Sequence, residues 1–279
     1  MMSTKKNTLT EKKHLTLAIS PCPNDTFIFH ALANRTLTLP DAEIDTAFED
    51  VETLNQAALR GVYDISKLSF HAYLLVEKAY RLLRTGAALG YGCGPLLVSR
   101  ERISPSEVNA LSVLVPGELT TAHLLLRLFA PTLKRKRFVR YDKVLPMLLD
   151  GEADAGVIIH EDRFVYASKG LFKVTDLGSW WEAETGAPIP LGCIAMRREL
   201  ADTYADRFDA LVRKSIEAAR SRPESVLPFI RAHAQQMDEI VLEKHIATFV
   251  NEYSFDLGAE GDSAIAALID RGRRAGIVS

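Results

Sequence analysis

Two segments of the sequence repeat the same order of helix, turn and strand signals, and this repeat limits the folds that the chain can adopt. The first segment runs from Asp50 to residue 70, and the second runs from Asp142 to His160. Each has an aspartate where a helix starts, apolar residues at helical spacing, and a glycine where the helix ends. An aspartate then follows three residues later, before a strand with a polar end. The sequence therefore predicts two similar α/β units.

The second unit ends in the stretch where chemistry is expected. Residues 157–159 form a short apolar run bounded by a turn and by charge, which is typical of a buried strand in a parallel sheet. Ligands of open α/β sheets bind where such strands end, so His160 is predicted at the rim of a site, as a candidate general base. A lone histidine can equally be a structural residue. Glu161 could either orient the imidazole or pair with Arg163.

Two extended stretches, residues 95–99 and 189–197, are predicted to cross between two lobes. In this division residues 1–13 form a disordered tail, residues 14–100 and 192–279 form a discontinuous first lobe, and residues 101–191 form an inserted second lobe. The predicted fold class is α/β, with the two-lobed layout of periplasmic-binding-protein type II folds. A ligand cleft lies between the lobes, and its closure can exclude water.

Composition and patterning argue against several classes of function. The formal net charge of −2 gives no electrostatic footprint for nucleic acid or anionic lipid. Residues 1–13 lack the apolar segment of a secretory signal, and no later stretch approaches a membrane span, so a cytoplasmic protein is expected. The basic run at residues 134–137 is expected to be a solvated helix end. Cys22, Cys93 and Cys193 are expected to be buried side chains, neither nucleophiles nor metal ligands.

Two further groups of polar residues are candidates for binding a ligand. In the loop after the first predicted strand, Asn24 or Asp25 can cap the following helix, whose first N–H groups face the same sheet edge. Lys67 and Ser69 occupy in the first unit the place that the His160 region has in the second. They could contact a ligand oxygen, although the lysine could also extend to solvent along apolar neighbours.

Thr120 and Thr121 directly precede an apolar helix. Threonines at this place commonly cap the helix, but their hydroxyls and the helix N–H groups could also bind a carboxylate. From the residues alone, the chain is predicted to be a two-lobed α/β protein that binds a small anion and has a candidate histidine base.

Six runs of residues resemble the 1,4-dihydroxy-6-naphthoate synthases of the futalosine route to menaquinone. The runs are SPCPNDTFIF at 20–29, EDVETLN at 49–55, KLS at 67–69, GCGPL at 92–96, TT at 120–121 and IIHE at 158–161. The resemblance spans nearly the whole chain after residue 13. It implies a lyase that converts cyclic dehypoxanthine futalosine to 1,4-dihydroxy-6-naphthoate and a three-carbon sugar remnant, with no metal and no organic cofactor.

The resemblance also implies roles for individual residues. His160 matches the proton acceptor, and substrate contacts are expected from Lys67, Leu68, Ser69, Thr120 and Thr121, together with Asn24 and Asp25 of the first run. Two alternatives stay open: a chorismate dehydratase-like sister enzyme on the same scaffold, and a cytosolic solute-binding or sensor protein. In each case the expected partner is a small molecule, with no nucleic acid and no membrane.

Overall fold

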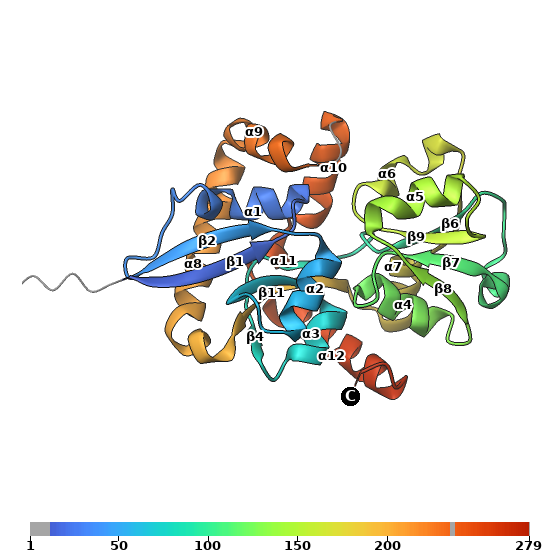
Figure 1. Cartoon of the computed structure of the whole chain (residues 1–279), viewed down its shortest axis with the longest axis horizontal. Coiled ribbons are helices and arrows are strands. Elements are labelled where there is room, and N and C mark those ends of the chain that lie inside the picture. Colours follow the sequence, from blue (N-terminus) through green and yellow to red (C-terminus); the bar gives the residue numbers. More distant parts are fainter. Residues whose placement is uncertain (1–11, 235–237, 279) are drawn as a thin grey trace, which may run out of the picture.

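Two β-sheets, each covered by helices, lie side by side along the longest axis of the molecule (Figure 1). The computed structural model describes residues 12–234 and 238–278. The larger sheet has the order β2-β1-β3-β11-β4, with β5 paired to β11. Its strands are β1 (Lys13–Ile19), β2 (Ala42–Phe48), β3 (Ile65–Ser69), β4 (Tyr80–Leu82), β5 (Ala88–Gly90) and β11 (Ile189–Arg197). We call the part of the chain around this sheet lobe 1.

The second sheet, which defines lobe 2, has the order β10-β6-β9-β7-β8. Its strands are β6 (Leu96–Ser99), β7 (Ser112–Val115), β8 (Arg135–Phe138), β9 (Ala155–Ile158) and β10 (Phe172–Asp176). In each sheet the strand at the end of the sequence repeat is parallel to a neighbour: β3 to β1, and β9 to β7. The carboxyl ends of β3 and β9 both lead to the space between the lobes, because the last three residues of β3 and the two residues directly after β9 line the same pocket.

Helices cover both sheets. Lobe 1 carries α1 (Pro23–Ala33), α2 (Val51–Leu59), α3 (Phe70–Val76), α8 (Arg198–Ser221), α9 (Pro223–His233), α10 (Glu239–Phe249), α11 (Glu252–Phe255) and α12 (Gly258–Arg274). Lobe 2 carries the short 3₁₀ helices η1 (Pro105–Ala110) and η2 (Ala167–Lys169), with α4 (Thr121–Phe129), α5 (Tyr141–Leu149), α6 (Asp162–Val165) and α7 (Leu177–Thr185). Local sequence determines where several of these helices begin. For example, the Asp50 carboxylate accepts from the Glu52 N–H at 3.0 Å and so caps α2.

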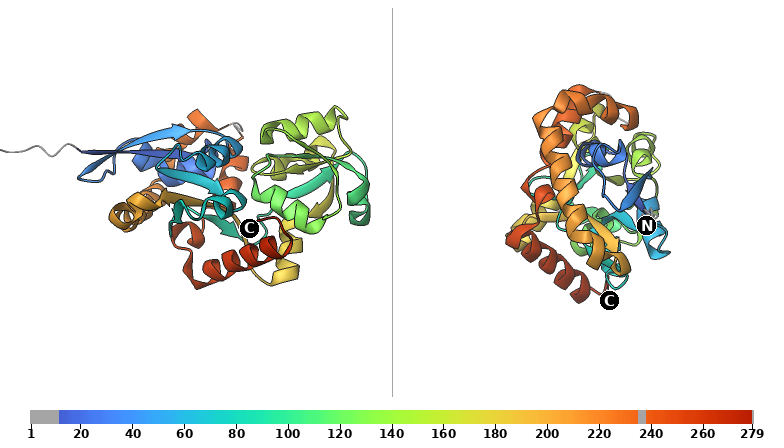
Figure 2. Two further views of the ribbon diagram at one scale, coloured as in Figure 1. Left: turned by 60° about the horizontal axis from the view of Figure 1, so that its bottom comes forward. Right: turned by 90° about the vertical axis from the view of Figure 1, so that its left-hand side faces the viewer.

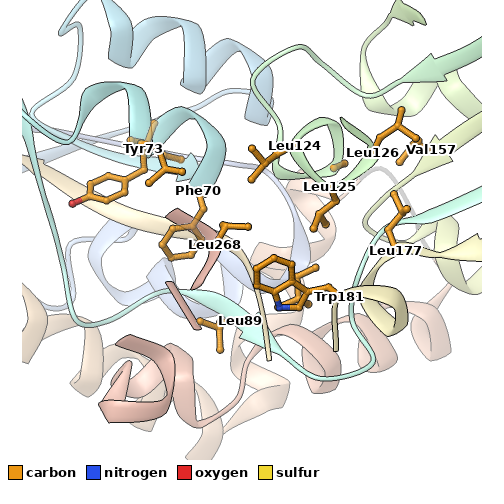
Figure 3. Packing of buried hydrophobic residues seen from close by; sticks show 14 of the residues in the cluster. Phe70, Tyr73, Leu89, Leu124, Leu125, Leu126, Val157, Leu177, Trp181 and Leu268 are labelled. Atoms are coloured by element: carbon orange, nitrogen blue, oxygen red, sulfur yellow. The ribbon is translucent and has the colours of Figure 1, made fainter. Parts of the chain in front are cut away.

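One buried hydrophobic cluster is shared by the two lobes. Phe70 and Leu268 of lobe 1 lie in the same cluster as Leu124, Leu125 and Trp181 of lobe 2 (Figure 3). A fully buried side chain of this size contributes about 1.5–3 kcal/mol relative to an exposed one. The arrangement shown therefore has a stable contact between the lobes.

The terminal helix α12 adds to this contact. It packs against β11 and also reaches α4 of lobe 2 (Figure 2, dark red). Near its end the Arg271 guanidinium donates to the Glu184 carbonyl at 2.6 Å and lies 3.7 Å from the Glu184 carboxylate on α7. A helix of lobe 1 is thus attached to lobe 2.

The boundaries predicted for the lobes need correction. Residues 95–99 are predicted to belong to the first lobe, whereas β6 pairs with β9 and β10 in the second sheet. The return to lobe 1 begins at Ile189, the first residue of β11, rather than at residue 192. The predicted tail, residues 1–13, lies mostly outside the described residues, but Lys13 already belongs to β1. A short apolar strand carries no local mark of the sheet it joins, since pairing depends on neighbours that come together only in the fold.

Three local predictions are also wrong. The basic run at residues 134–137 lies mostly in β8, an edge strand whose charged side chains face solvent, as is typical of protected sheet edges. Neither Asn24 nor Asp25 caps α1, because Pro23 is favoured at a first helical position and the N-cap is Cys22. Asp142 also does not cap its helix, because it lies in the first turn of α5 rather than at the N-cap.

Candidate active site between the lobes

A cavity of about 80 Å³ lies between the lobes, and both lobes supply its walls. All eight residues predicted as site residues line it: Asn24, Asp25, Lys67, Leu68, Ser69, Thr120, Thr121 and His160. Residues from distant parts of the chain complete the wall, among them Cys93, Arg163 and Phe249. The structure therefore brings the predicted residues together in one pocket.

His160 follows β9 with a backbone φ of +54°, a conformation that few residues other than glycine adopt. Such strained positions cluster at functional sites, because the surrounding structure holds the side chain in one direction. The Nε2 atom lies 3.8 Å from the Cys22 sulfur, and the ring packs edge-on against Tyr141 at 5.0 Å. Burial lowers the pKa of His160, although the negative charge of Glu161 opposes this. The imidazole is therefore neutral near pH 7 and able to accept a proton.

Cys22 does not have the properties of a nucleophile. Burial, with the charge of Glu161, raises the pKa of its thiol well above the usual value, so the thiolate is not populated near neutral pH. The side chain is 4% exposed and free. A thiol beside Nε2 of His160 can instead orient the ring as a weak hydrogen-bond donor.

Beneath the pocket lies a buried ion pair. The Lys67 Nζ atom lies 2.7 Å from Oδ1 of Asp25, and both side chains are buried. Asp25 also accepts from the Ser20 hydroxyl at 2.7 Å and from the Asn24 amide at 2.8 Å. The Lys67 ammonium has a second acceptor in the Gly86 carbonyl at 3.4 Å, which leaves one of its three donors for a ligand. Removing either member of such a pair destabilises a protein by about 3–5 kcal/mol.

Ser69 and the two threonines differ in whether their hydroxyl hydrogens are free to bind a ligand. The Ser69 hydroxyl accepts from the Asn55 amide at 3.1 Å, so its own hydrogen can point into the pocket. The Thr120 hydroxyl caps α4 by accepting from the His123 N–H and donates to the Gly117 carbonyl at 3.1 Å. Thr121 donates to the Leu191 carbonyl at 2.6 Å. With both threonine hydrogens directed at carbonyls, a carboxylate at this end of the pocket would depend on the N–H groups of α4.

His245 was not foreseen from the sequence, since it lies in the unremarkable helix α10. It is fully buried, its Nε2 donates to the Asn24 amide oxygen at 2.9 Å, and its ring stacks on that of His160 at 6.0 Å. Burial and the nearby positive groups lower the pKa of His245 well below its usual value. It is therefore neutral near pH 7 and joins the Asn24 network to the candidate base.

Glu161 and Arg163 take neither of the arrangements considered from the sequence. Glu161 is buried, and its Oε2 has no hydrogen-bond partner among the described residues, so within that part of the chain it neither orients the imidazole nor pairs with Arg163. The nearest carboxylate to the Arg163 guanidinium is that of Asp176, at 3.8 Å. Within the described residues no cluster of His, Cys, Asp or Glu could hold a metal ion, and no helix is long and apolar enough to span a membrane.

Comparison with known proteins places this pocket in a family. A family model described as menaquinone biosynthesis matches residues 15–274. The chain belongs to this family. It is 46% identical over 265 residues to the 1,4-dihydroxy-6-naphthoate synthase of Thermus thermophilus, covering 95% of this chain and 96% of that protein. It is 41% identical over 269 residues to the protein of the same name from Streptomyces coelicolor, covering 95% and 94%. The resemblance seen in the six sequence runs is thereby confirmed.

Solved structures agree with the predicted fold. A crystal structure of a protein from Archaeoglobus fulgidus has a TM-score of 0.90 and 32% identity, over 95% of this chain and 98% of that one. The alkanesulfonate-binding protein of Xanthomonas axonopodis has a TM-score of 0.70 at 13% identity, over 96% and 95%. At that identity the likeness concerns the fold alone, and it confirms the two-lobed, periplasmic-binding-protein-like prediction for this member of the menaquinone biosynthesis family.

Proposed function

We propose that this chain is a 1,4-dihydroxy-6-naphthoate synthase, a lyase that forms 1,4-dihydroxy-6-naphthoate from cyclic dehypoxanthine futalosine in menaquinone biosynthesis. The proposal draws on identity to two proteins of that name along almost the whole chain. The observation that carries its chemistry is the imidazole of His160, which lines the interlobe pocket with a pKa lowered by burial.

In this mechanism His160 removes a carbon-bound proton from the substrate. Formation of the second aromatic ring provides the driving force for the elimination, so the protein mainly has to position the substrate, accept the proton and exclude water. Proton transfer to a positioned side chain typically accelerates a reaction by about 10²–10⁴-fold. His160 is suited to act as the base because its imidazole is neutral near pH 7 and can accept a proton.

The remaining groups act on oxygen atoms of the substrate. The Ser69 hydroxyl and the third donor of Lys67 polarise one oxygen, at a position where negative charge develops during the reaction. The N–H groups at the start of α4, next to Thr120 and Thr121, hold a second oxygen. Asn24 and Asp25 keep Lys67 and His245 in place beneath the pocket.

The proposal also covers substrate class and location. The substrate is a small anion, which suits a pocket whose wall includes Lys67 and Arg163. We place the protein in the cytoplasm, because Cys22, Cys93 and Cys193 are all free, and free cysteines suit a reducing compartment.

The His160→Asn variant tests the role of the base. Asparagine tolerates the left-handed backbone at this position, so the change removes the imidazole without adding backbone strain. We expect kcat to fall by about 10²–10⁴-fold while the Kd for 1,4-dihydroxy-6-naphthoate stays the same. His14→Asn, at an exposed histidine of β1, is the matched control.

Two outcomes would contradict these proposals separately. Unchanged turnover in His160→Asn would remove the histidine from the mechanism and leave the activity in place. Failure of the unaltered protein to convert cyclic dehypoxanthine futalosine, with turnover of chorismate instead, would assign the chain to the sister reaction.

A further inference from the structure

Arg163 is a nearly buried cation in the pocket wall, and it makes no hydrogen bond within the part of the chain that the structure describes. Its side chain is 11% exposed, and its buried Nη1 has no hydrogen-bond partner among the described residues. The Nη2 atom lies 3.8 Å from Oδ2 of Asp176, which is beyond hydrogen-bond distance. A guanidinium has five N–H donors, and leaving buried donors unpaired is unfavourable.

Asp176 does not compensate for this, because its carboxylate has another task. Its Oδ1 accepts from the N–H groups of Gly178 and Ser179, at 2.9 and 3.0 Å, and so caps α7. The aspartate partly balances the charge of Arg163 without satisfying its donors. The guanidinium therefore has a counter-ion nearby and, among the described residues, uncommitted donors in the wall of the pocket that it lines.

The other groups of the pocket wall that could bind an anion are more committed than Arg163, although the Ser69 hydroxyl hydrogen and one Lys67 donor remain free. Lys67 is bound at 2.7 Å to Asp25, and the hydroxyl hydrogens of Thr120 and Thr121 are directed at backbone carbonyls. His160 is neutral near pH 7, since burial lowers its pKa. Among the described residues that line the pocket, Arg163 is thus the cation with the most uncommitted donors.

We propose that Arg163 binds the carboxylate of the aromatic acid that occupies this pocket, through a two-pronged guanidinium–carboxylate pair. The planar fork of arginine matches a carboxylate in shape, and such pairs give orientation as well as affinity. The apolar side chains of Leu68, Leu191 and Phe249 line the same cavity and suit the ring of the acid. The identity of the acid, a naphthoate, rests on the proposed function.

This geometry gives Arg163 a role in specificity. The residue stands three positions after His160, in the short helix α6, so a ring whose carboxylate is held by Arg163 is fixed relative to the base. A ligand that lacks the carboxylate would leave the guanidinium buried and unpaired, and would be rejected on that account.

The test compares a charged ligand with its neutral counterpart. Calorimetry measures the Kd of 2-naphthoate and of 2-naphthamide for the unaltered protein and for Arg163→Gln, Arg163→Lys and Arg137→Gln. The last variant is the control, because Arg137 is half exposed, pairs with Glu152, does not line the pocket, and loses the same charge. We expect the acid to bind the unaltered protein more tightly than the amide. Arg163→Gln should weaken acid binding by roughly 10- to 100-fold and leave amide binding unchanged.

The lysine variant should retain part of the preference, since it keeps the charge and loses the fork, and the control should retain all of it. An unchanged acid-to-amide ratio in Arg163→Gln, an equal loss for both ligands, or no acid preference in the unaltered protein would each overturn the inference. Because binding of these probes requires no turnover, the result is separate from the synthase assay. A protein without synthase activity can still show the arginine-dependent preference, and an active synthase can fail to show it.

Discussion

His160 combines a strained backbone with a lowered pKa, and the second property has a measurable consequence. A general base acts in its neutral form, which persists to lower pH when the pKa falls. Burial lowers the pKa of His160 from its ordinary value of 6.5. We expect kcat/KM to be constant near neutrality and to decline, as pH falls, only below pH 6.5. Rate measurements between pH 4.5 and pH 8 would check this.

Removing the neighbouring charge of Glu161 provides a second test of this pH profile. The negative charge of Glu161 raises the pKa of His160 against the effect of burial. Glu161→Gln should therefore move the acidic decline to still lower pH, whereas a decline centred above pH 7 in the unaltered protein would be inconsistent with His160 as the base.

The sequence predicted which residues surround the pocket better than it predicted what they bind. All eight predicted site residues line the cavity, because each lies at a strand end or a helix start that local pattern identifies. His245 was missed because α10 joins the site only through tertiary packing. Arg163 was noted only as a partner for Glu161, since a sequence does not show which carboxylate a side chain will meet.

Among the elements, the approach of the loop before β6 to the start of α7 depends on two glycines. A Cβ atom built on Gly178 would lie 2.7 Å from the Cα atom of Gly94, and one built on Gly94 would overlap Gly178 still more. Gly94 also lines the pocket, so this contact helps to define its shape.

Gly94→Ala should therefore separate the loop from α7. We expect a loss of about 1–3 kcal/mol in the free energy of unfolding, as for other overpacked sites, and weaker binding of 1,4-dihydroxy-6-naphthoate. Urea unfolding and calorimetry would measure the two effects. Gly61→Asn is the control, because Gly61 has a φ of +64° with open space around it, and asparagine tolerates that conformation. Equal stability of the two variants would show that the close contact does not matter.

Local signals account for most elements and fail where tertiary neighbours decide. Asp50 caps α2 as predicted, and Thr120 caps α4, which was one of the two roles considered for it; both bonds lie within three residues. Residues 135–138 form β8 instead of a helix end because β7 offers them a parallel partner. Trp180 and Trp181 lie in α7, and Trp181 is buried in the cluster that the two lobes share.

At the scale of the whole molecule, the cavity between the lobes is small for the proposed ligand. Its volume is about 80 Å³, whereas a cavity that holds benzene measures about 150 Å³. A two-ring ligand therefore needs a wider cleft. Two side chains of α2 hold the cleft closed: the Glu52 carboxylate accepts from the Leu119 N–H at 3.0 Å, and the Asn55 amide donates to the Leu119 carbonyl at 3.3 Å.

Replacing both Glu52 and Asn55 with alanine should shift the unliganded protein toward an open form, because lobe 2 loses these two bonds to α2. We expect a larger radius of gyration in X-ray scattering than for the unaltered protein, and a return toward the smaller value when 1,4-dihydroxy-6-naphthoate is added. Glu43→Ala, an exposed change on β2, should leave the scattering unchanged. Identical curves for all three proteins would exclude a restraining role for Glu52 and Asn55.

The attachment of α12 to both lobes limits how such a movement can occur. Arg271 fixes the far end of this helix to Glu184, so separating the halves must either bend the helix or release that end. The contact between Arg271 and Glu184 therefore contributes to the barrier to ligand entry, although it lies on a surface remote from the pocket. Substitutions on that surface can therefore change the rates of substrate binding and product release without changing the rate of the chemical step.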